Sequence, residues 1–243
     1  MNYPDIIAKM TLEEKAYLLS GKDFWSTRTV ERLGVPSIVL LKNEGNILPL
    51  SKGAQVAVIG EFAQKARYQG AGSSVVNCTK LDNTMDVICG CALDVVGFEA
   101  GYPRSGPGNA EMQAKAVELA KKAEFVLLYL GLDEISESEG LDRAHMKLPQ
   151  SQIDLLSAVS AANPNVILVL SAGSAIEMPW LDQCKAVVHG YLCGQAGAGA
   201  VLKVITGEVN PSGKLSESYP LRYEDTPPLT KPFLPPDLER KSE

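Results

Sequence analysis

The sequence predicts an α/β fold: a three-layer α/β/α sandwich with a mostly parallel sheet of about five or six strands. Two observations lead to this expectation. Short apolar runs rich in β-branched residues lie at 56–60, 125–132, 166–173 and 186–192, which is typical of parallel strands buried on both faces. Helical patterns lie between these runs, so strand and helix alternate along the chain.

Two of the intervening segments have clear helical patterns. The segment that begins at Asn109 has an apolar face formed by Met112, Ala116, Leu119 and Ala123, which share one side of a helix. A second helix is expected to begin at Pro149. Turn residues at 207–215 lead out of a further helix, and we expect a last strand near 216–220.

Composition and charge limit the classes of function. The chain has 243 residues, and 45% of them are hydrophobic, which is ample for a buried core. The net charge of −6 and a pI near 5.1 leave no basic face for a phosphate backbone. We therefore expect neither nucleic acid nor an anionic membrane as a partner.

The cysteines and the N-terminus indicate a compartment. Neither a signal-peptide core nor an apolar stretch of about 20 residues is visible, so we expect a cytoplasmic protein. The cysteine number is odd and no C-x-x-C pair suggests a zinc site. We expect buried free thiols in a reducing compartment at all five cysteines, Cys78, Cys89, Cys91, Cys184 and Cys193.

Three motifs for other chemistries fail on inspection. The strand that ends at Gly60 opens like a dinucleotide-binding fold, but the residues at 61–63 supply no further glycine. The GK pairs at 21–22 and 213–214 lack the upstream glycine and the Ser or Thr of a phosphate-binding loop. No G-x-S-x-G elbow is present for a serine hydrolase. Of the two histidines, His145 lies in a loop, and His189 is expected to be a core residue with satisfied hydrogen bonds.

An acidic loop follows the predicted strand at 125–132. It contains Asp133, Glu134, Glu137, Glu139 and Asp142, followed by Arg143. One interpretation is a solvated acidic loop. The other is a ligand site, because open α/β sheets bind ligands beyond the carboxyl ends of their strands. A glutamate there can act as a general acid or base, while Asp142 and Arg143 are expected to position the loop through an ion pair.

The string SEGLDR at 138–143, followed by LPQSQ at 148–152, resembles the acid/base segment of glycoside hydrolase family 3 β-glucosidases. The stretches at 39–50, 67–77 and 207–215, and the GQAGAGA run from Gly194, agree in order and spacing. The resemblance implies that Glu139 is the catalytic acid/base.

The same resemblance bears on the loop at 67–77. It implies that Ser73 reaches the sugar, with Ser74 and Arg67 as further candidates for the same substrate-binding rim. The alternative for the two serines is a glycine-rich turn that bonds its own backbone.

The resemblance also suggests three regions. Residues 1–37 resemble the opening of the family's barrel domain and include a helix expected over 12–20. Residues 38–223 resemble its α/β-sandwich domain, and residues 224–243 are expected to form an extended tail. A (β/α)8 barrel needs about 250 residues, so the barrel is expected to be missing between 37 and 39, and with it the nucleophilic aspartate.

The resemblance implies hydrolysis of terminal β-linked glucosyl residues without any cofactor or metal. A retaining glycosidase needs two carboxyl groups, so this chain is expected to be inactive alone. The implied partners are a β-glucoside or oligosaccharide and a barrel-containing chain or a second copy. The alternatives are a non-catalytic carbohydrate-binding or interaction module, and an unrelated nucleotide-binding domain.

Overall fold

A computed structural model describes residues 11, 21–23, 26–27 and 38–225 of the chain. The helix expected over 12–20 and the tail from residue 226 lie outside the described residues. A two-stranded sheet is formed by β1 (Gly21–Asp23) and β2 (Ser26–Thr27). The α/β domain occupies the continuous range from 38 onward.

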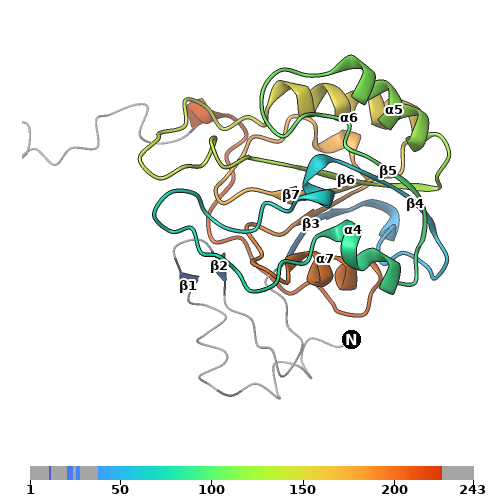
Figure 1. Cartoon of the computed structure of the whole chain (residues 1–243), viewed down its shortest axis with the longest axis horizontal. Helices are drawn as coiled ribbons and strands as arrows, with labels where there is room; N and C mark the ends of the chain where they lie inside the picture. The colour runs from blue at the N-terminus through green and yellow to red at the C-terminus, as the bar shows by residue number, and fades with distance from the viewer. Residues whose placement is uncertain (1–10, 12–20, 24–25, 28–37, 226–243) are drawn as a thin grey trace, which may run out of the picture.

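A six-stranded sheet forms the centre of the domain (Figure 1). Only its edge strand β3 runs antiparallel to its neighbour, and the other pairs are parallel. The sequence prediction of a mostly parallel sheet with helices is confirmed. In spatial order the strands are β3 (Val39–Asn43), β8 (Ala186–His189), β7 (Val166–Ser171), β6 (Phe125–Gly131), β4 (Gln55–Ile59) and β5 (Asp94–Glu99).

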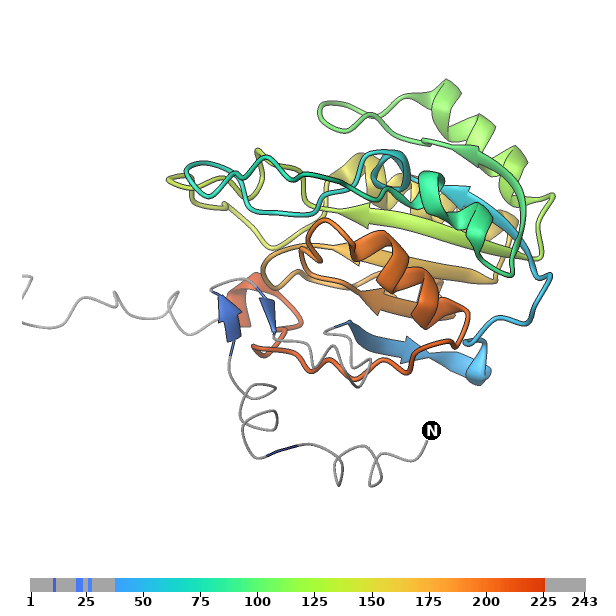
Figure 2. The ribbon, with the colours of Figure 1, turned by 60° about the horizontal axis from the view of Figure 1, so that its bottom comes forward.

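Helices cover both faces of this sheet (Figure 2). One face carries α5 (Ala110–Ala120) and α6 (Gln150–Ala162), which pack on β6 and β7 through one apolar cluster. The opposite face carries α3 (Glu61–Gln64), α4 (Thr84–Val87) and α7 (Gly197–Ile205), which enclose a second cluster. The domain is therefore a three-layer sandwich with its core divided by the sheet.

Local sequence explains how α5 begins. Asn109 is its N-cap, and the Asn109 side chain accepts a hydrogen bond from the Met112 backbone N–H at 3.0 Å, which satisfies a donor that the helix leaves free. Ala116 is fully buried, as the periodicity predicts, together with Ala120. The remaining short turns are 3-10 helices at Glu44–Asn46, Ile88–Gly90, Leu181–Gln183 and Tyr223–Asp225.

The last strand expected near 216–220 is not formed. Both edges of β8 are already occupied, by β7 and by β3, so residues 216–220 cannot pair with β8. The segment is instead attached through side chains: the Tyr219 hydroxyl lies 2.7 Å from Nε2 of His189, and the Ser216 N–H donates to the Tyr191 hydroxyl at 3.2 Å. His189 is fully buried, which confirms that it is a satisfied core residue.

The cysteines differ in burial from the expectation. All five are free thiols, but only Cys184 is buried, while Cys89 is exposed and the other three are half-buried. Cys89 and Cys91 follow the short α4 and lie in a connection rather than in the sheet; Cys91 packs against the second apolar cluster, whereas Cys89 is exposed. In the described part of the chain, no helix is both long and apolar enough to cross a bilayer.

The parallel strands end at one edge of the sheet, where the loops after β4, β6 and β7 project together (Figure 1). Gly60 makes the first of these connections possible. It has a φ of +118°, and a Cβ there would lie 2.2 Å from the backbone oxygen of Tyr129, so only glycine lets the chain turn this closely against β6.

Candidate active site

Two loops meet at the carboxyl edge of the sheet and form the candidate site. One connects α3 to α4 (residues 65–83), and the other connects β6 to α6 (residues 132–149); they lie side by side in both views (Figures 1 and 2). Their backbones pair at a parallel bridge between Ala71 and Ser138. The Glu139 N–H also donates to the Ala71 oxygen at 3.3 Å. The two loops are therefore joined beside Glu139.

This junction brings together Ser73 and Glu139, which are 66 residues apart in sequence. The Ser73 backbone N–H donates to Oε2 of Glu139 at 2.7 Å, and the Ser73 hydroxyl donates to the same oxygen. Both residues are exposed. The two donors lower the pKa of the Glu139 carboxyl, the hydroxyl having the larger effect, because they favour its charged form. Glu139 is thus an ionised carboxylate open to solvent.

Gly72 allows the close approach of the two loops. Its φ is +92°, and a Cβ at this position would lie 2.6 Å from Cβ of Glu139. The glycine-rich segment does form a turn, in which the Val75 N–H donates to the Gly72 oxygen at 3.2 Å. The Ser73 hydroxyl, however, bonds Glu139 rather than its own backbone. The turn places Ser73 against the carboxylate.

The other two residues expected at the rim lie elsewhere. Ser74 is exposed, and its hydroxyl lies 2.9 Å from the place that a Cβ on Gly70 would occupy, toward the stem of the loop. Arg67 is only 4% exposed and lies 3.9 Å from the carboxylate of Glu137. The structure therefore brings Ser73 to Glu139 and holds Arg67 beneath the loop.

Gln69 closes the loop that carries Ser73, a role that sequence reasoning missed. Its side-chain amide donates to the Val76 oxygen and accepts from the Val76 N–H, both at 3.0 Å. It also donates to the Tyr68 hydroxyl at 2.8 Å. A glutamine in a glycine-rich loop carries no distinctive pattern, so only the structure identifies it.

The acidic loop is held by a hydrogen bond and an ion pair that a fully solvated loop would lack. Asp133 is buried and accepts a hydrogen bond from the Ser136 N–H at 2.8 Å. Glu134 forms a two-point ion pair with Arg104, at 2.5 Å to Nη2 and 3.0 Å to Nε. These contacts hold the start of the loop against the domain, and Glu139 remains exposed at its tip.

The expected ion pair between Asp142 and Arg143 is not formed. Asp142 is exposed and has no ion pair in the described ranges. Arg143 turns inward because acceptors are available after β7, and it donates to the Ser174 hydroxyl at 2.7 Å and to the Ala175 oxygen at 3.1 Å. Arg143 thus bonds the segment after β7 rather than Asp142, and its role in positioning the loop stays a prediction.

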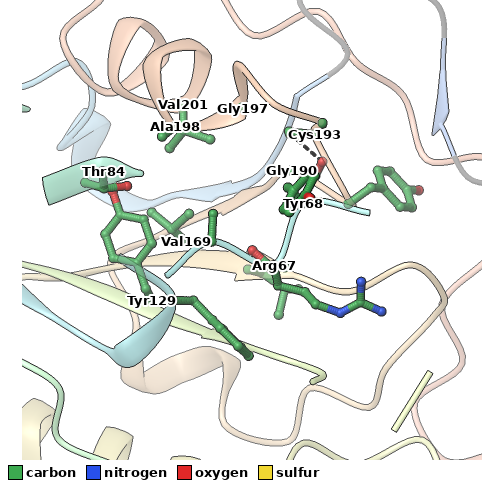
Figure 3. Close-up of a pocket in the computed structure, with 16 residues that line it drawn as sticks. Arg67, Tyr68, Thr84, Tyr129, Val169, Gly190, Cys193, Gly197, Ala198 and Val201 are labelled. Atoms are coloured by element: carbon green, nitrogen blue, oxygen red, sulfur yellow. Dashed lines mark hydrogen bonds between the residues drawn. The ribbon is translucent and has the colours of Figure 1, made fainter. Parts of the chain in front are cut away.

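A small cavity lies at the base of these loops, between α7 and the sheet. Figure 3 shows Ala198 and Val201 of α7 on one side of it and Arg67 on the other. Its volume is about 40 Å³, whereas sites for small organic ligands have about 300–1,000 Å³. The cavity is therefore too small for a ligand of that kind. Across the described ranges, no three His, Cys, Asp or Glu side chains gather as a metal site.

The fold and these contacts define an α/β domain that presents a hydrogen-bonded carboxylate at the carboxyl edge of its sheet. Residues 38–242 match the model of the glycosyl hydrolase family 3 C-terminal domain. The chain belongs to glycoside hydrolase family 3.

Individual relatives agree with this assignment. The chain is 41% identical over 203 residues to thermostable β-glucosidase B of Acetivibrio thermocellus, covering 82% of this chain and 27% of that protein. It is 43% identical over 234 residues to an exo-α-(1→6)-L-arabinopyranosidase of Bifidobacterium breve, covering 92% and 30%. The solved family 3 β-glucosidase of Bifidobacterium adolescentis matches with a TM-score of 0.77 and 42% identity, over 82% of this chain and 29% of that one. The chain thus spans less than a third of the length of these relatives.

Proposed function

We propose that the chain is the acid/base-bearing domain of a β-glucosidase-type glycoside hydrolase that acts on terminal β-linked glucosyl residues. Glu139 protonates the leaving oxygen and then activates water for the second step. The observation that carries this proposal is the paired hydrogen bond from Ser73 to Glu139 at the carboxyl edge of the sheet. This geometry fixes one carboxylate oxygen and leaves the other for a substrate.

The electrostatics of Glu139 support a site that a second domain completes. A general acid must carry a proton, but the bonds from Ser73 lower the pKa of the exposed Glu139 carboxyl. A docked domain would remove water from this carboxyl and raise its pKa. We propose that a barrel-containing partner does this and supplies the nucleophilic carboxylate, so that the chain alone is inactive.

Exposed apolar side chains around Glu139 support such a docking surface. Val75 and Val76 on one loop, and Ile135 and Leu141 on the other, are each more than half exposed. Apolar groups gathered on a surface favour contact with another protein. The same surface supports the second candidate, a non-catalytic carbohydrate-binding module that dimerises through it.

The identity of the terminal sugar is the more specific part of the proposal. The relatives include a β-glucosidase and an arabinopyranosidase, and most contacts to the sugar would come from the partner. We propose β-glucosides or glucose-terminated oligosaccharides as substrates, and faster turnover of an aryl α-L-arabinopyranoside than of the aryl β-glucoside would contradict this choice.

The test is hydrolysis of an aryl β-glucoside by the purified chain, alone and mixed with the part of the Acetivibrio β-glucosidase that precedes the matched segment. With phenol as the leaving group, we expect turnover only in the mixture, and turnover lower by about 10²–10⁴ when the chain carries Glu139→Ala. Turnover of the phenyl glucoside that is unchanged by Glu139→Ala would contradict the proposal. No turnover in any mixture, together with a dimer by size-exclusion chromatography and sugar binding by calorimetry, would favour the second candidate.

A further inference from the structure

Glu137 lies two residues before Glu139 but points the opposite way, into the domain. Its side chain is 10% exposed. Both of its oxygens accept from the Gly173 N–H, at 3.0 and 2.9 Å, and Oε1 also accepts from the Ser174 hydroxyl at 2.8 Å. Gly173 and Ser174 follow β7, so Glu137 fastens the loop after β6 to the loop after the neighbouring strand.

Two arginines flank this carboxylate. Nη2 of Arg67 lies 3.9 Å from Oε2 of Glu137, and Arg143 reaches the same Ser174 hydroxyl at 2.7 Å. Burial lowers the pKa of both guanidinium groups, and the charge of Glu137 opposes this effect in each. Glu137 therefore favours the charged form of both arginine side chains.

Other charged groups face the cluster more weakly. Glu134, Asp133 and Arg104 act on Arg67 only through their charges, and Glu217 acts in the same way on Arg143. Within the described residues, Nε and Nη2 of Arg67 have no hydrogen-bond acceptor. In the part of the chain that the structure describes, Glu137 is the carboxylate in salt-bridge range of Arg67, so its removal would leave a buried cation poorly compensated.

The cluster connects both halves of the candidate site. Arg67 stands at the root of the loop that carries Ser73, and Glu137 stands at the root of the tip that carries Glu139. Between them, Ser138 forms the backbone bridge with Ala71. A shift of Glu137 would move this bridge and separate the Ser73 donors from the Glu139 carboxylate.

We propose that Glu137 is a positioning residue that fixes Glu139 against Ser73 by anchoring the loop to the end of β7 and to Arg67. The importance of Glu137 for catalysis rests on the proposed function, whereas the effect of Glu137 on the position of Glu139 does not.

The test is the pKa of the Glu139 carboxyl, measured by ¹³C NMR titration in the full chain with Glu137→Gln. Loss of positioning removes the Ser73 donors, so this pKa should rise toward its ordinary value of 4.5. Loss of a negative neighbour alone has the opposite sign, because a nearby like charge raises a carboxyl pKa. The direction of the shift therefore separates positioning from simple charge.

Glu134→Gln is the matched control. It makes the same change of charge in the same loop but breaks the pair with Arg104 outside the cluster, so the pKa of Glu139 should not rise. Ser174→Ala keeps the charge and removes one hydrogen bond to Glu137, so it should give a smaller rise.

Circular dichroism identifies the variants that fold. A rise in Glu137→Gln but not in Glu134→Gln supports the proposal. No rise in a folded Glu137→Gln, or an equal rise in the control, overturns it. If Glu137→Gln does not fold, Ser174→Ala decides: a rise supports the proposal and no rise overturns it. The titration uses no substrate, so its outcome is independent of whether the chain supports glycoside hydrolysis.

Discussion

Acidification should destabilise the domain through His189. This side chain lies on β8 and is fully buried. Its Nδ1 lies 3.3 Å from the Leu170 carbonyl, and its Nε2 lies 2.7 Å from the Tyr219 hydroxyl. A carbonyl only accepts, so Nδ1 carries the proton and Nε2 accepts from the tyrosine. Burial lowers the pKa of His189 from 6.5 to about 4.

This shift gives the direction and size of the effect. Between pH 6.5 and about 4 the unfolded chain binds a proton at His189 while the folded chain does not, so the free energy of unfolding falls as the pH falls. At about 1.4 kcal/mol for each pH unit, the total loss approaches roughly 3 kcal/mol. Above pH 6.5 His189 is largely neutral in both the folded and the unfolded chain, so none of this free energy of unfolding is lost.

Urea unfolding at pH 7, 6 and 5 measures this effect. His189→Gln should flatten the dependence on pH, whereas the matched change at the exposed histidine, His145→Gln, should leave it unchanged. The comparison of variants also removes the contribution of Glu217, whose carboxyl has a pKa raised by burial. An identical loss of stability with and without His189, or an NMR titration of His189 near 6.5, would show that burial of this side chain does not cause the loss.

Two further changes test the site and its support. Ser73→Ala should raise the pKa of the Glu139 carboxyl by removing a donor to the charged form, whereas Ser74→Ala should not; equal values in a ¹³C NMR titration would contradict the assigned contact. Gln152 is buried and bonds both the N–H and the oxygen of Gly131 at 2.9 Å. Gln152→Leu should therefore lower the free energy of unfolding by about 1–3 kcal/mol, and an unchanged urea midpoint would show that these bonds contribute little.

The central strands of the sheet can be predicted from the sequence, but its two edge strands cannot. The runs that form β4, β6, β7 and β8 are continuous and apolar because helices cover them on both faces. β5 alternates between exposed and half-buried positions at one edge, so its pattern is weak. β3 is half-buried along most of its length, and its antiparallel pairing with β8 depends on tertiary contacts.

The candidate site, too, can be predicted only in part from the sequence. The resemblance identifies Glu139 and Ser73 one at a time, but their contact depends on how two loops of different strands cross. Glu137 appears in the sequence only as another acidic residue of the same loop. Its inward orientation depends on the Gly173 N–H at the end of β7, a partner that no local pattern reveals.

The leaving-group dependence of kcat/KM tests whether Glu139 acts as the general acid. The chain and its Glu139→Ala variant, each mixed with the preceding part of the Acetivibrio β-glucosidase, are compared on phenyl and dinitrophenyl β-glucosides. If Glu139 is the general acid, the variant should lose about 10²–10⁴ in kcat/KM on the phenyl glucoside, which needs a proton on its leaving oxygen, and far less on the dinitrophenyl glucoside. Equal losses on both substrates, or no loss on either, would contradict that role for Glu139.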